Sequence, residues 1–519
     1  MLRPGMLRTA VALAAIGLVF SARFVSARPP AAKLLPQKTA MAVSITSVPE
    51  LSKRFMNTSI GRMSQDPQLL PFIKTLYGSV VDAVAQFQDR IELGLPDLLA
   101  LPQGELTLAL LTLDDEQPSA VVLADVGDQL ANAKRLIQKG GDALEKAGAK
   151  KSEQTLDGTV VVAYDGVGRR GQRRVLWCEK EGTIVISTSD AAMKQLLARW
   201  SGEEGGGLGD NSKFAAVLQQ CTSVKGEEPQ LVWFVDPIGL LRAAGQGNAG
   251  AQLAIALLPT LGLDGLTAAG GSIAFDAGQF ETVAQFHLLL ENPRAGVLDA
   301  IALEPGDVRP ERWVPADVVN YVTLRWNFLR TYKTVSKLYD SLRGEGSFAA
   351  LINSRLTGPL GIDVATEFLP HLDGRVSWYG QIDRPATFEG QRAAGGLKLK
   401  DPEAMAKTLE KAYEKYKDNL TIGTSGDIRY YQVKPPEANP DAPPRPRPAP
   451  CFGVVDDYLL FAERPETFER ALAARKKPAE GLAEALDFKL VASKIGRRIG
   501  NVKPALLRGL ARAGGADAL

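Results

Sequence analysis

The sequence predicts an α+β protein: two diverged copies of a strand–helix–hairpin unit, joined by a strand-rich middle block, with mostly antiparallel sheets. Three observations predict this. Stretches that alternate apolar and polar residues, as half-buried strands do, are mixed with stretches of helical periodicity. The strands follow one another as hairpins and not as strict strand–helix–strand crossovers, which favours the α+β class. Five local patterns recur in the same order in both halves, which indicates an internal repeat.

The chain has 519 residues, of which 45% are hydrophobic and 23% charged, a balance typical of a globular protein with a large core. Lys and Arg number 61 against 59 Asp and Glu, so the formal net charge is only +2. Because the chain has no basic stripe with interleaved aromatic residues, we expect no nucleic-acid partner. Two His and three Cys restrict the common routes to metal binding and nucleophilic catalysis.

Residues 1–27 have the pattern of a signal peptide. It consists of a positive start, an apolar stretch and small residues at a cleavage site: Arg3 and Arg8, Thr9 to Phe20, and Val25-Ser26-Ala27. The apolar stretch is shorter than the about 20 residues that span a bilayer, so we expect export to the periplasm or another extracytoplasmic location. Arg23 supports the alternative, an uncleaved anchor in the inner membrane that gives the chain membrane contact.

The remaining chain divides by its repeated patterns. We expect a linker, copy one, the middle block, copy two and a basic C-terminal tail at residues 28–37, 38–225, 226–312, 313–495 and 496–519. The first two patterns are a strand running into a helix, and a Leu-Pro turn entering a strand. The former occurs at residues 42–56 and 321–338; the latter begins at Leu101-Pro102 and at Leu369-Pro370.

The third pattern is the sharpest, because A-x-A-K-x-L opens a helix at both Ala131–Leu136 and Ala404–Leu409. The fourth is a strand pair that carries Cys178 in one copy and Cys451 in the other, at the same distance from that helix. The fifth is a strand, a helix and a Gly-Leu turn before a Phe. It ends at Gly207-Leu208 and Phe214, and again at Gly481-Leu482 and Phe488.

The middle block is predicted to extend one sheet or to bridge the copies. Its expected elements are a strand at 230–234, an apolar helix at 249–258 ended by Pro259, a long hairpin at 266–275 and 280–290, and a short helix at 297–303.

Several local features accompany these elements. Ser187 and Asp190 have the spacing of a capping box, and Pro465 suits a first helical position. The Pro-rich stretch 435–450 is expected to be an extended, solvated hairpin insertion, with a ligand for an SH3-like partner as the alternative. The tail is expected to be a frayed terminus, or else a short basic amphipathic helix at anionic lipid.

Cys178, Cys221 and Cys451 cannot all pair within one chain. One disulfide with a free thiol is one arrangement. Three buried thiols that act as small apolar residues is the arrangement we favour.

The search for catalytic motifs identifies no catalytic residue and no cofactor site. No phosphate-binding G-x-x-x-x-G-K-[ST] occurs, and Gly205 to Gly209 is interpreted as a flexible loop. No G-x-S-x-G occurs, and Gly423-Thr424-Ser425-Gly426 is one residue too short to form that turn. Paired carboxylates for hydrolysis stay open, because sequence alone places no two of them together.

One cluster of residues is a candidate metal site. Asp363, Glu367, His371 and Asp373 lie close in sequence, and Glu367 and His371 would share one face of a continuous helix. Pro370 is expected to end that helix, so we interpret the stretch as a structural turn and expect no metal. The other histidine, His287, is expected on the surface of a strand.

The stretch Thr39 to Leu51, the Leu-Pro turn before a strand and the hairpin Leu266 to Leu290 are the features of a resemblance. The chain resembles an uncharacterised family of exported bacterial proteins with a domain of unknown function. The resemblance covers most of the mature chain and implies an extracytoplasmic location. It implies no established reaction and carries over no catalytic residues.

Three functions therefore stand as hypotheses. The first is a non-enzymatic envelope protein that binds an unknown partner or serves as a scaffold. The second is a carrier of a lipid or another apolar ligand, which needs a large apolar cavity between a curved sheet and its helices. The third is a hydrolase that uses Asp and Glu chemistry.

Overall fold

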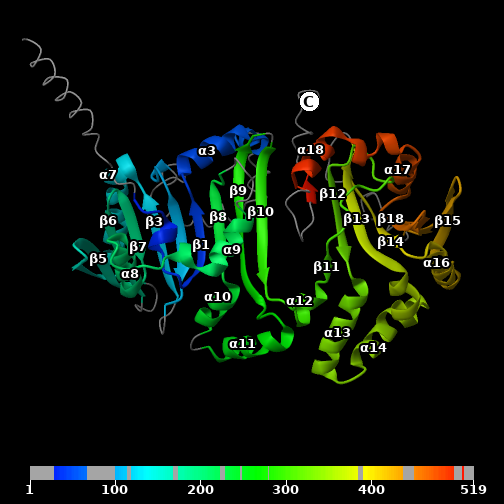
Figure 1. Ribbon diagram of the computed structural model, residues 1–519, viewed down its shortest axis with the longest axis horizontal. Helices are drawn as coiled ribbons and strands as arrows, with labels where there is room; N and C mark the ends of the chain where they lie inside the picture. The colour runs from blue at the N-terminus through cyan, green and yellow to red at the C-terminus, as the bar shows by residue number, and fades with distance from the viewer. Residues whose placement is uncertain are drawn as a thin grey trace, which may run out of the picture. The chain divides into compact units, whose positions relative to one another are not determined.

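The computed structural model describes residues 28–66, 100–113, 118–167, 173–221, 228–245, 248–278, 280–383, 390–435, 449–495 and 505–507. The chain divides into two compact units. Unit 1 comprises residues 1–55, 70–244 and 268–287, and unit 2 comprises residues 56–69, 245–267 and 288–519. Each unit is built on one mainly antiparallel sheet with helices beside it, so the predicted α+β class is confirmed (Figure 1).

Unit 1 is built on a ten-stranded sheet with the order β10-β9-β8-β1-β2-β3-β7-β6-β5-β4. The strands are β1 Thr39–Ile45, β2 Leu106–Leu111, β3 Ser119–Asp125, β4 Lys150–Leu156, β5 Thr159–Val167, β6 Arg173–Lys180, β7 Thr183–Ser187, β8 Leu231–Val235, β9 Leu266–Ala277 and β10 Phe280–Leu290. The middle block therefore extends one sheet, since β8, β9 and β10 continue it beyond β1.

The helices of unit 1 are α2 Ala31–Leu34, α3 Val48–Asn57, α7 Leu130–Lys146, α8 Asp190–Trp200, α9 Ser212–Cys221 and α10 Pro237–Ala244. Helix α8 buries Met193, Leu196 and Leu197, which share one face because they are three and four residues apart. The predicted capping box at Ser187 is wrong. Ser189 is the N-cap and accepts a hydrogen bond from the backbone of Ala192, because the helix begins later than the pattern implied.

Unit 2 is built on a nine-stranded sheet with the order β11-β12-β13-β14-β18-β17-β16-β15, and β19 also pairs with β12. The strands are β11 Leu303–Glu304, β12 Asn320–Trp326, β13 Leu372–Ile382, β14 Gln391–Leu399, β15 Leu420–Ser425, β16 Ile428–Val433, β17 Cys451–Val455, β18 Tyr458–Ala462 and β19 Ala505–Leu507. The helical alternative for the tail is therefore wrong at residues 505–507, whose backbone forms strand β19 and pairs with β12.

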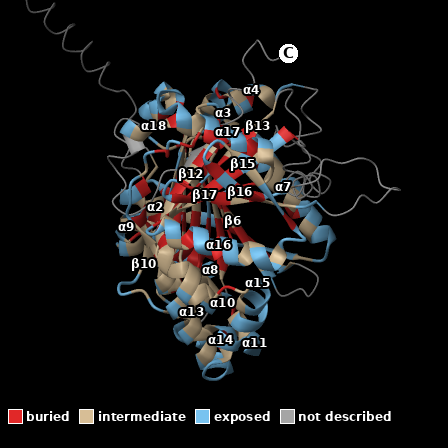
Figure 2. Cartoon of the chain, turned by 90° about the vertical axis from the view of Figure 1, so that its right-hand side faces the viewer, coloured by how far each residue is buried: buried red, intermediate tan, exposed pale blue. Residues whose placement is uncertain are grey.

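The helices of unit 2 include α4 Ser59–Met63, α11 Ala249–Leu261, α12 Gly296–Ala300, α13 Phe328–Arg343, α14 Ser347–Ile352, α16 Pro402–Tyr416, α17 Pro465–Lys476 and α18 Leu486–Ile495. Pro465 takes the first position of α17, as predicted. Figure 2 colours many strand residues as buried, whereas α13 and α14 are mainly intermediate or exposed. The core of unit 2 gathers around Tyr321, Tyr379 and Phe468.

Two predicted helix boundaries in the middle block are wrong. Helix α11 continues past Pro259 to Leu261, because a proline in the last turn removes a single hydrogen bond. It ends at Gly262, which adopts the left-handed conformation typical of a helix terminus. The short helix expected at 297–303 ends at Ala300, and Leu303 instead begins β11.

Seven strands have the same order in both sheets. The series β1-β2-β3-β7-β6-β5-β4 of unit 1 corresponds to β12-β13-β14-β18-β17-β16-β15 of unit 2. In both, a helix that carries A-x-A-K-x-L lies between the third and fourth strands in sequence, and another helix follows the seventh. Cys178 lies on β6 and Cys451 on the corresponding β17. Descent from one duplicated unit stays a prediction.

In each unit, a segment that precedes the first of the seven matching strands packs against the sheet. We call residues 28–36 the first lead segment and residues 307–315 the second, because they precede β1 and β12. The first lies within the stretch expected to be a linker, but α2 and the fully buried Leu34 and Leu35 make it part of the core. The buried leucines of this segment follow neither the helical nor the strand period, so the sequence pattern did not predict that the segment belongs to the core.

A Gly-Leu turn fastens each lead segment. In unit 1, Gly207 forms a β-bridge with Pro36, and the Leu208 amide donates to the Leu35 carbonyl at 2.7 Å. Gly481 bridges Pro315 in the same way, and the backbone of the next residue, Leu482, bonds the second lead segment. The flexible loop expected at residues 205–209 is therefore wrong for its second half.

Some predictions fall outside the described residues. These are the signal peptide or anchor at 1–27, residues 436–448 of the Pro-rich stretch, and the tail apart from residues 505–507. Within the described part of the chain, no helix is both long and apolar enough to cross a membrane.

Candidate functional site

A buried ion pair joins the second lead segment to the sheet of unit 2. The Glu311 side chain is only 4% exposed, and its carboxylate lies 2.7 Å from Nε of Arg375 on β13. Tyr321 and Tyr458 donate their hydroxyls to the same carboxylate at 2.9 and 3.3 Å, and Ser377 donates a further hydrogen bond. Both carboxylate oxygens thus accept hydrogen bonds from protein donors.

Arg375 is held as closely as its partner. Its side chain is 11% exposed, its Nε lies 3.3 Å from the hydroxyl of Thr323, and Nη2 donates to the Arg309 carbonyl. Asp307 lies 3.5 Å from Nη1. The hydroxyls of Thr323 and Ser377 are 2.8 Å apart across β12 and β13. The cluster therefore connects three strands, β12, β13 and β18, with three residues of the second lead segment.

The ionisation of this cluster follows from burial. Burial raises the pKa of Tyr321 and of Tyr458 well above the ordinary phenol value, and the negative Glu311 raises both further. Burial opposes the charge on Arg375, but Glu311, Tyr321 and Tyr458 together outweigh it, so the pKa of the guanidinium lies above its ordinary value. The tyrosines therefore stay protonated hydroxyl donors. A carboxylate held by so many donors suits anchoring of a chain segment better than proton transfer to a substrate.

Unit 1 has a corresponding cluster. Arg28 in the first lead segment donates to the Glu105 carboxylate, which also accepts from the Ala31 amide at 3.0 Å. Thr107 on β2 donates to Ser44 on β1 at 2.8 Å and lies 3.3 Å from Glu105. As in unit 2, a charged residue of the sheet side, here Glu105, binds the lead segment and lies next to a pair of hydrogen-bonded hydroxyls on two adjacent strands.

The two clusters have opposite polarity. Glu105 and Arg375 each stand two residues before the hydroxyl residue of the strand, in register-equivalent places. In unit 1 the sheet contributes the anion and Arg28 the cation; in unit 2 the sheet contributes the cation and Glu311 the anion.

The candidate metal residues are engaged with other partners. Asp363 caps the turn Val364–Phe368 by accepting from two backbone amides. Glu367 accepts from the Asp363 amide at 2.7 Å and pairs with Lys411 of α16 at 2.7 Å. Its hydrogen bond with Lys411 holds the pKa of Glu367 below its usual range.

His371 and Asp373 lie on the other side of Pro370. His371 ends the short 3₁₀ turn that carries Pro370, and Asp373 on β13 pairs with Arg325 at 2.9 Å. No group of three or more metal-ligating side chains occurs among the described residues. The interpretation of a structural turn at this place fits the geometry.

The other residues singled out by sequence are found in strands. His287 is half-buried on β10, and burial lowers its pKa. Residues 423–426 form the end of the β15–β16 hairpin, where Ser425 faces Ile428.

The three cysteine side chains are buried and free of disulfides, as in the favoured arrangement. Burial raises the pKa of Cys178 and of Cys451 to about 12, and that of Cys221 to about 11. Because the raised pKa keeps each thiol protonated and burial excludes reagent, the folded protein is expected to react with less than one equivalent of Ellman's reagent at pH 8. Unfolding in guanidinium should release all three. Rapid reaction of two or more thiols in the folded protein would contradict this arrangement.

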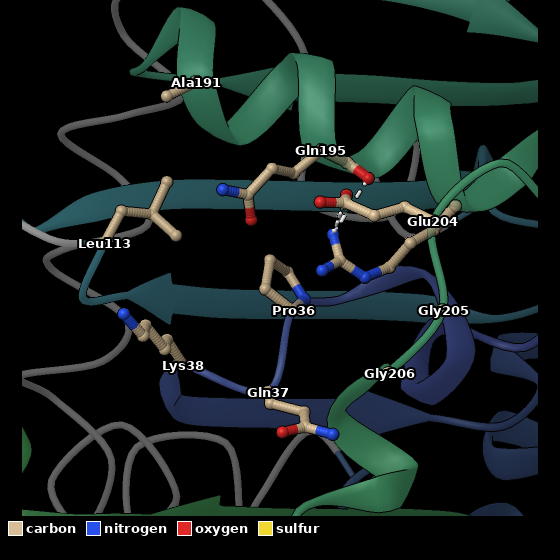
Figure 3. A pocket seen from close by; sticks show the side chains of 10 residues that line it. Pro36, Gln37, Lys38, Leu113, Ala191, Gln195, Glu204, Gly205 and Gly206 are labelled. Atoms are coloured by element: carbon tan, nitrogen blue, oxygen red, sulfur yellow. Dashed lines mark hydrogen bonds and ion pairs between the residues drawn. The ribbon is translucent and has the colours of Figure 1, made fainter.

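Unit 1 also contains an open cleft of about 490 Å³ (Figure 3). It is lined by Pro36, Gln37, Lys38, Leu113, Ala191, Gln195, Arg199, Glu204, Gly205 and Gly206. Its volume lies in the range of small-molecule sites, but such sites are mostly apolar and this lining is largely polar. Arg199 is bound within the wall, because its Nη1 donates to the Gln195 carbonyl at 3.0 Å and pairs with Glu204 at 2.9 Å.

In unit 2, the place that corresponds to this cleft is occupied by ion pairs of Arg470. Gln195 precedes the buried pair Leu196-Leu197 of α8, and Arg470 precedes the buried pair Ala471-Leu472 of α17. Arg470 pairs with Asp317 at 2.7 Å and with Asp383 at 3.4 Å. The cleft of unit 1 therefore lies where the uncharged Gln195 replaces an arginine that, in unit 2, ties α17 to Asp317, just before β12, and to Asp383, just after β13.

Each sheet carries a row of apolar residues on one face. In unit 2, cross-strand partners form the row Val322, Trp378, Gly395, Phe461, Phe452, Tyr431 and Ile422. Helix α16 covers the row at Tyr431, which packs with Met405 and Leu409. Trp378, Phe461 and the last member, Ile422, remain 39%, 41% and 42% exposed.

The corresponding row of unit 1 is Trp233, Val43, Leu108, Val122, Ile186, Trp177 and Val162. Here Ala133 and Ile137 of α7 pack with Ile186 and Trp177. Leu108, in the position of Trp378, is 51% exposed. In both units a helix covers part of the row and leaves the same position of the second strand open.

No protein-family model matches the chain, and neither a curated protein nor a solved structure is similar to it. The sequence did not predict the Glu311–Arg375 cluster, the cleft or the exposed part of the apolar rows. Trp378, Phe461 and Leu108 each lie between buried residues along their strands, so the sequence alone does not distinguish them from core residues.

Proposed function

We propose that this chain is a non-enzymatic binding or scaffold protein of the bacterial envelope. Residues 1–27 direct its export to the periplasm or another extracytoplasmic place, or anchor it in the inner membrane. The proposal is in keeping with the resemblance to exported proteins that have a domain of unknown function. It is supported by the way the fold uses its buried charges, since the Glu311–Arg375 and Arg28–Glu105 pairs hold the lead segments to the sheets.

The observation that carries the proposal is the exposed aromatic surface at Trp378 and Phe461. The two residues flank Gly395 in one cross-strand row. A side chain at Gly395 would meet the Phe461 ring at 2.7 Å, so the missing side chain lets that ring lie over the strand. Contiguous exposed aromatic area is costly in water and is typical of surfaces that bind something.

The same surface favours a second candidate, a carrier of a lipid or another apolar ligand. The row is open at Trp378 and Phe461, covered by α16 at Tyr431, and open again at Ile422. An acyl chain would fit such a surface because apolar contact there removes area from water. The polar cleft of unit 1 does not support an apolar ligand. The Asp/Glu hydrolase hypothesis gains no support from Asp363 and Glu367, which are engaged in a cap and an ion pair.

Native mass spectrometry of the purified mature chain distinguishes the two candidates. A scaffold or partner-binding protein is expected to show the mass of the polypeptide alone. A carrier is expected to show an added lipid-sized mass that is lost in the Trp378→Ala/Phe461→Ala variant. The matched control is Leu486→Ala, because Leu486 is highly exposed but lies on α18, away from the row.

The outcomes decide between the proposals. An apolar ligand that is released only by the double variant would overturn the scaffold proposal. An empty protein that also fails to take up acyl chains from phosphatidylethanolamine–phosphatidylglycerol vesicles would overturn the carrier.

We also propose that the two units descend from one duplicated unit. The support is the shared order of seven strands, the lead segment fastened by a Gly-Leu turn in each unit, and the cross-strand hydroxyls beside each ion pair. An experimental structure in which the seven strands of the two units do not superpose would refute this proposal.

A further inference from the structure

The ends of the two sheets differ in how well they are protected. A sheet edge exposes unpaired backbone groups, and proteins usually protect it with charge, a short strand or a cover. In unit 1, the edge strand β4 carries Lys150, Lys151 and Glu153 and is mostly exposed. In unit 2, the edge strand β11 has two residues, and β15 has six with Gly423 among them. These three edges have features that discourage pairing with another chain.

The remaining edge strand, β10, lacks these features. It has eleven residues, Phe280–Leu290, and contains no Lys, Arg or Pro. Its ionisable residues are Glu281 and His287, and burial lowers the pKa of His287, which leaves it neutral at pH 7. Two large apolar side chains on one face are exposed, Phe286 at 60% and Leu288 at 43%. The strand is therefore long and mainly apolar, and Glu281, near its start, is its one acidic residue.

The apolar face of β10 continues an existing surface. Phe286 stacks on Trp233 of β8 with ring centroids 5.6 Å apart. Trp233 pairs with Val43 of β1, and Val43 with Leu108 of β2. A strand added beside β10 would extend this row and cover Phe286. The strand that fits needs an apolar residue at alternate positions and no charge near its centre.

We propose that the outer edge of β10 pairs antiparallel with β10 of a second copy of this chain, so that two sheets join across a two-fold axis. β10 is itself a strand that fits beside β10, because antiparallel pairing about its middle places Phe286 and Leu288 of both copies on the same face. With the axis near residue 285, the two Glu281 side chains stand about eight residues apart along the strands, roughly 26 Å, and do not repel each other.

The first test is the oligomeric state of the mature chain, measured by sedimentation velocity between 1 and 100 μM. A dimer is expected. Ala284→Lys places a cation on the exposed face at the centre of β10 and should raise the dissociation constant at least about tenfold, since two copies would bring like charges together. The matched control is Thr155→Lys, an exposed position on the edge strand β4, which should leave the dimer unchanged. A monomer at 100 μM would refute the proposal.

The second test locates the contact. The native thiols are buried, so a cysteine introduced at an exposed position is the main reactive thiol. Ala284→Cys is expected to be crosslinked between the two copies by a short bis-maleimide, because the two introduced cysteines lie two positions apart along the paired strands, whereas Thr155→Cys is expected to stay monomeric on a denaturing gel. Equal crosslinking of both variants, or a dimer that Ala284→Lys does not weaken, would place the contact elsewhere and overturn the proposal.

Discussion

Replacing Glu311 with glutamine is expected to lower the free energy of unfolding of unit 2 by about 3–5 kcal/mol. The variant keeps the size of the side chain but removes the charge that Arg375 faces at 2.7 Å. Arg375 would then be a buried cation without its main counter-charge. Tyr321 donates to one carboxylate oxygen and Ser377 and Tyr458 to the other, so in the variant one of these two positions becomes an amide NH2 that accepts no hydrogen bond.

Urea denaturation followed by circular dichroism measures this loss, and hydrogen–deuterium exchange of β12 and β13 assigns it to unit 2. Lys134→Ala is the control, because the Lys134–Glu179 pair at 3.0 Å is largely exposed and should contribute at most about 1 kcal/mol. Glu311→Gln combined with Arg375→Met is expected to cost less than the sum of the two single variants, since it removes both charges. If Glu311→Gln is no more destabilising than Lys134→Ala, the pair does not anchor the lead segment.

Gly207→Ala is expected to destabilise unit 1 by about 2–3 kcal/mol, in the upper part of the range for overpacking. A Cβ at this position would lie 2.6 Å from the Lys33 carbonyl oxygen and 2.8 Å from that of Ala32. Both are backbone atoms, so no side-chain rotation relieves the contact. The backbone of Gly207 has φ −79°, which any residue adopts, so the cost comes from close approach alone.

Two other glycines provide the comparison. Gly205 lies two residues earlier in the same loop, and a Cβ there meets nothing within 4 Å, so Gly205→Ala should have little effect. At Gly481, the equivalent turn of unit 2, the nearest atoms are 3.3 and 3.4 Å away, so Gly481→Ala should have an intermediate effect. Thermal unfolding of the three variants measures the order. Equal destabilisation by Gly205→Ala and Gly207→Ala would show that close packing of the lead segment is not the cause.

Much of the fold follows from local sequence signals. The A-x-A-K-x-L helices form where predicted, at Ala131–Leu136 within α7 and Ala404–Leu409 within α16. The alternating stretches form strands because one side chain in two faces a core. Several of the errors lie at element ends, as at Ser187 and Pro259, where one hydrogen bond decides the boundary.

The charged clusters were beyond sequence reasoning for a physical reason. Glu311 and Arg375 are 64 positions apart, and neither belongs to a spaced motif. Comparing the sequences of the two halves does not reveal that the clusters correspond, because the acidic Glu105 stands where the other unit has the basic Arg375. The cleft was equally inaccessible, because it depends on Gln195 not making the contact that Arg470 makes. Sequence thus predicted which segments fold, but not which charges hold them.

The opposite polarity of the two ion pairs has a consequence for how the chain sorts itself during folding. With two sheets of similar strand order in one polypeptide, each lead segment meets two similar docking places. An exchange would put Arg28 beside Arg375, and Glu311 beside Glu105. Both wrong pairings bring like charges into poorly solvated positions, which costs several kcal/mol. The sign of one charge, positive at Arg28 and negative at Glu311, therefore determines which sheet each lead segment binds.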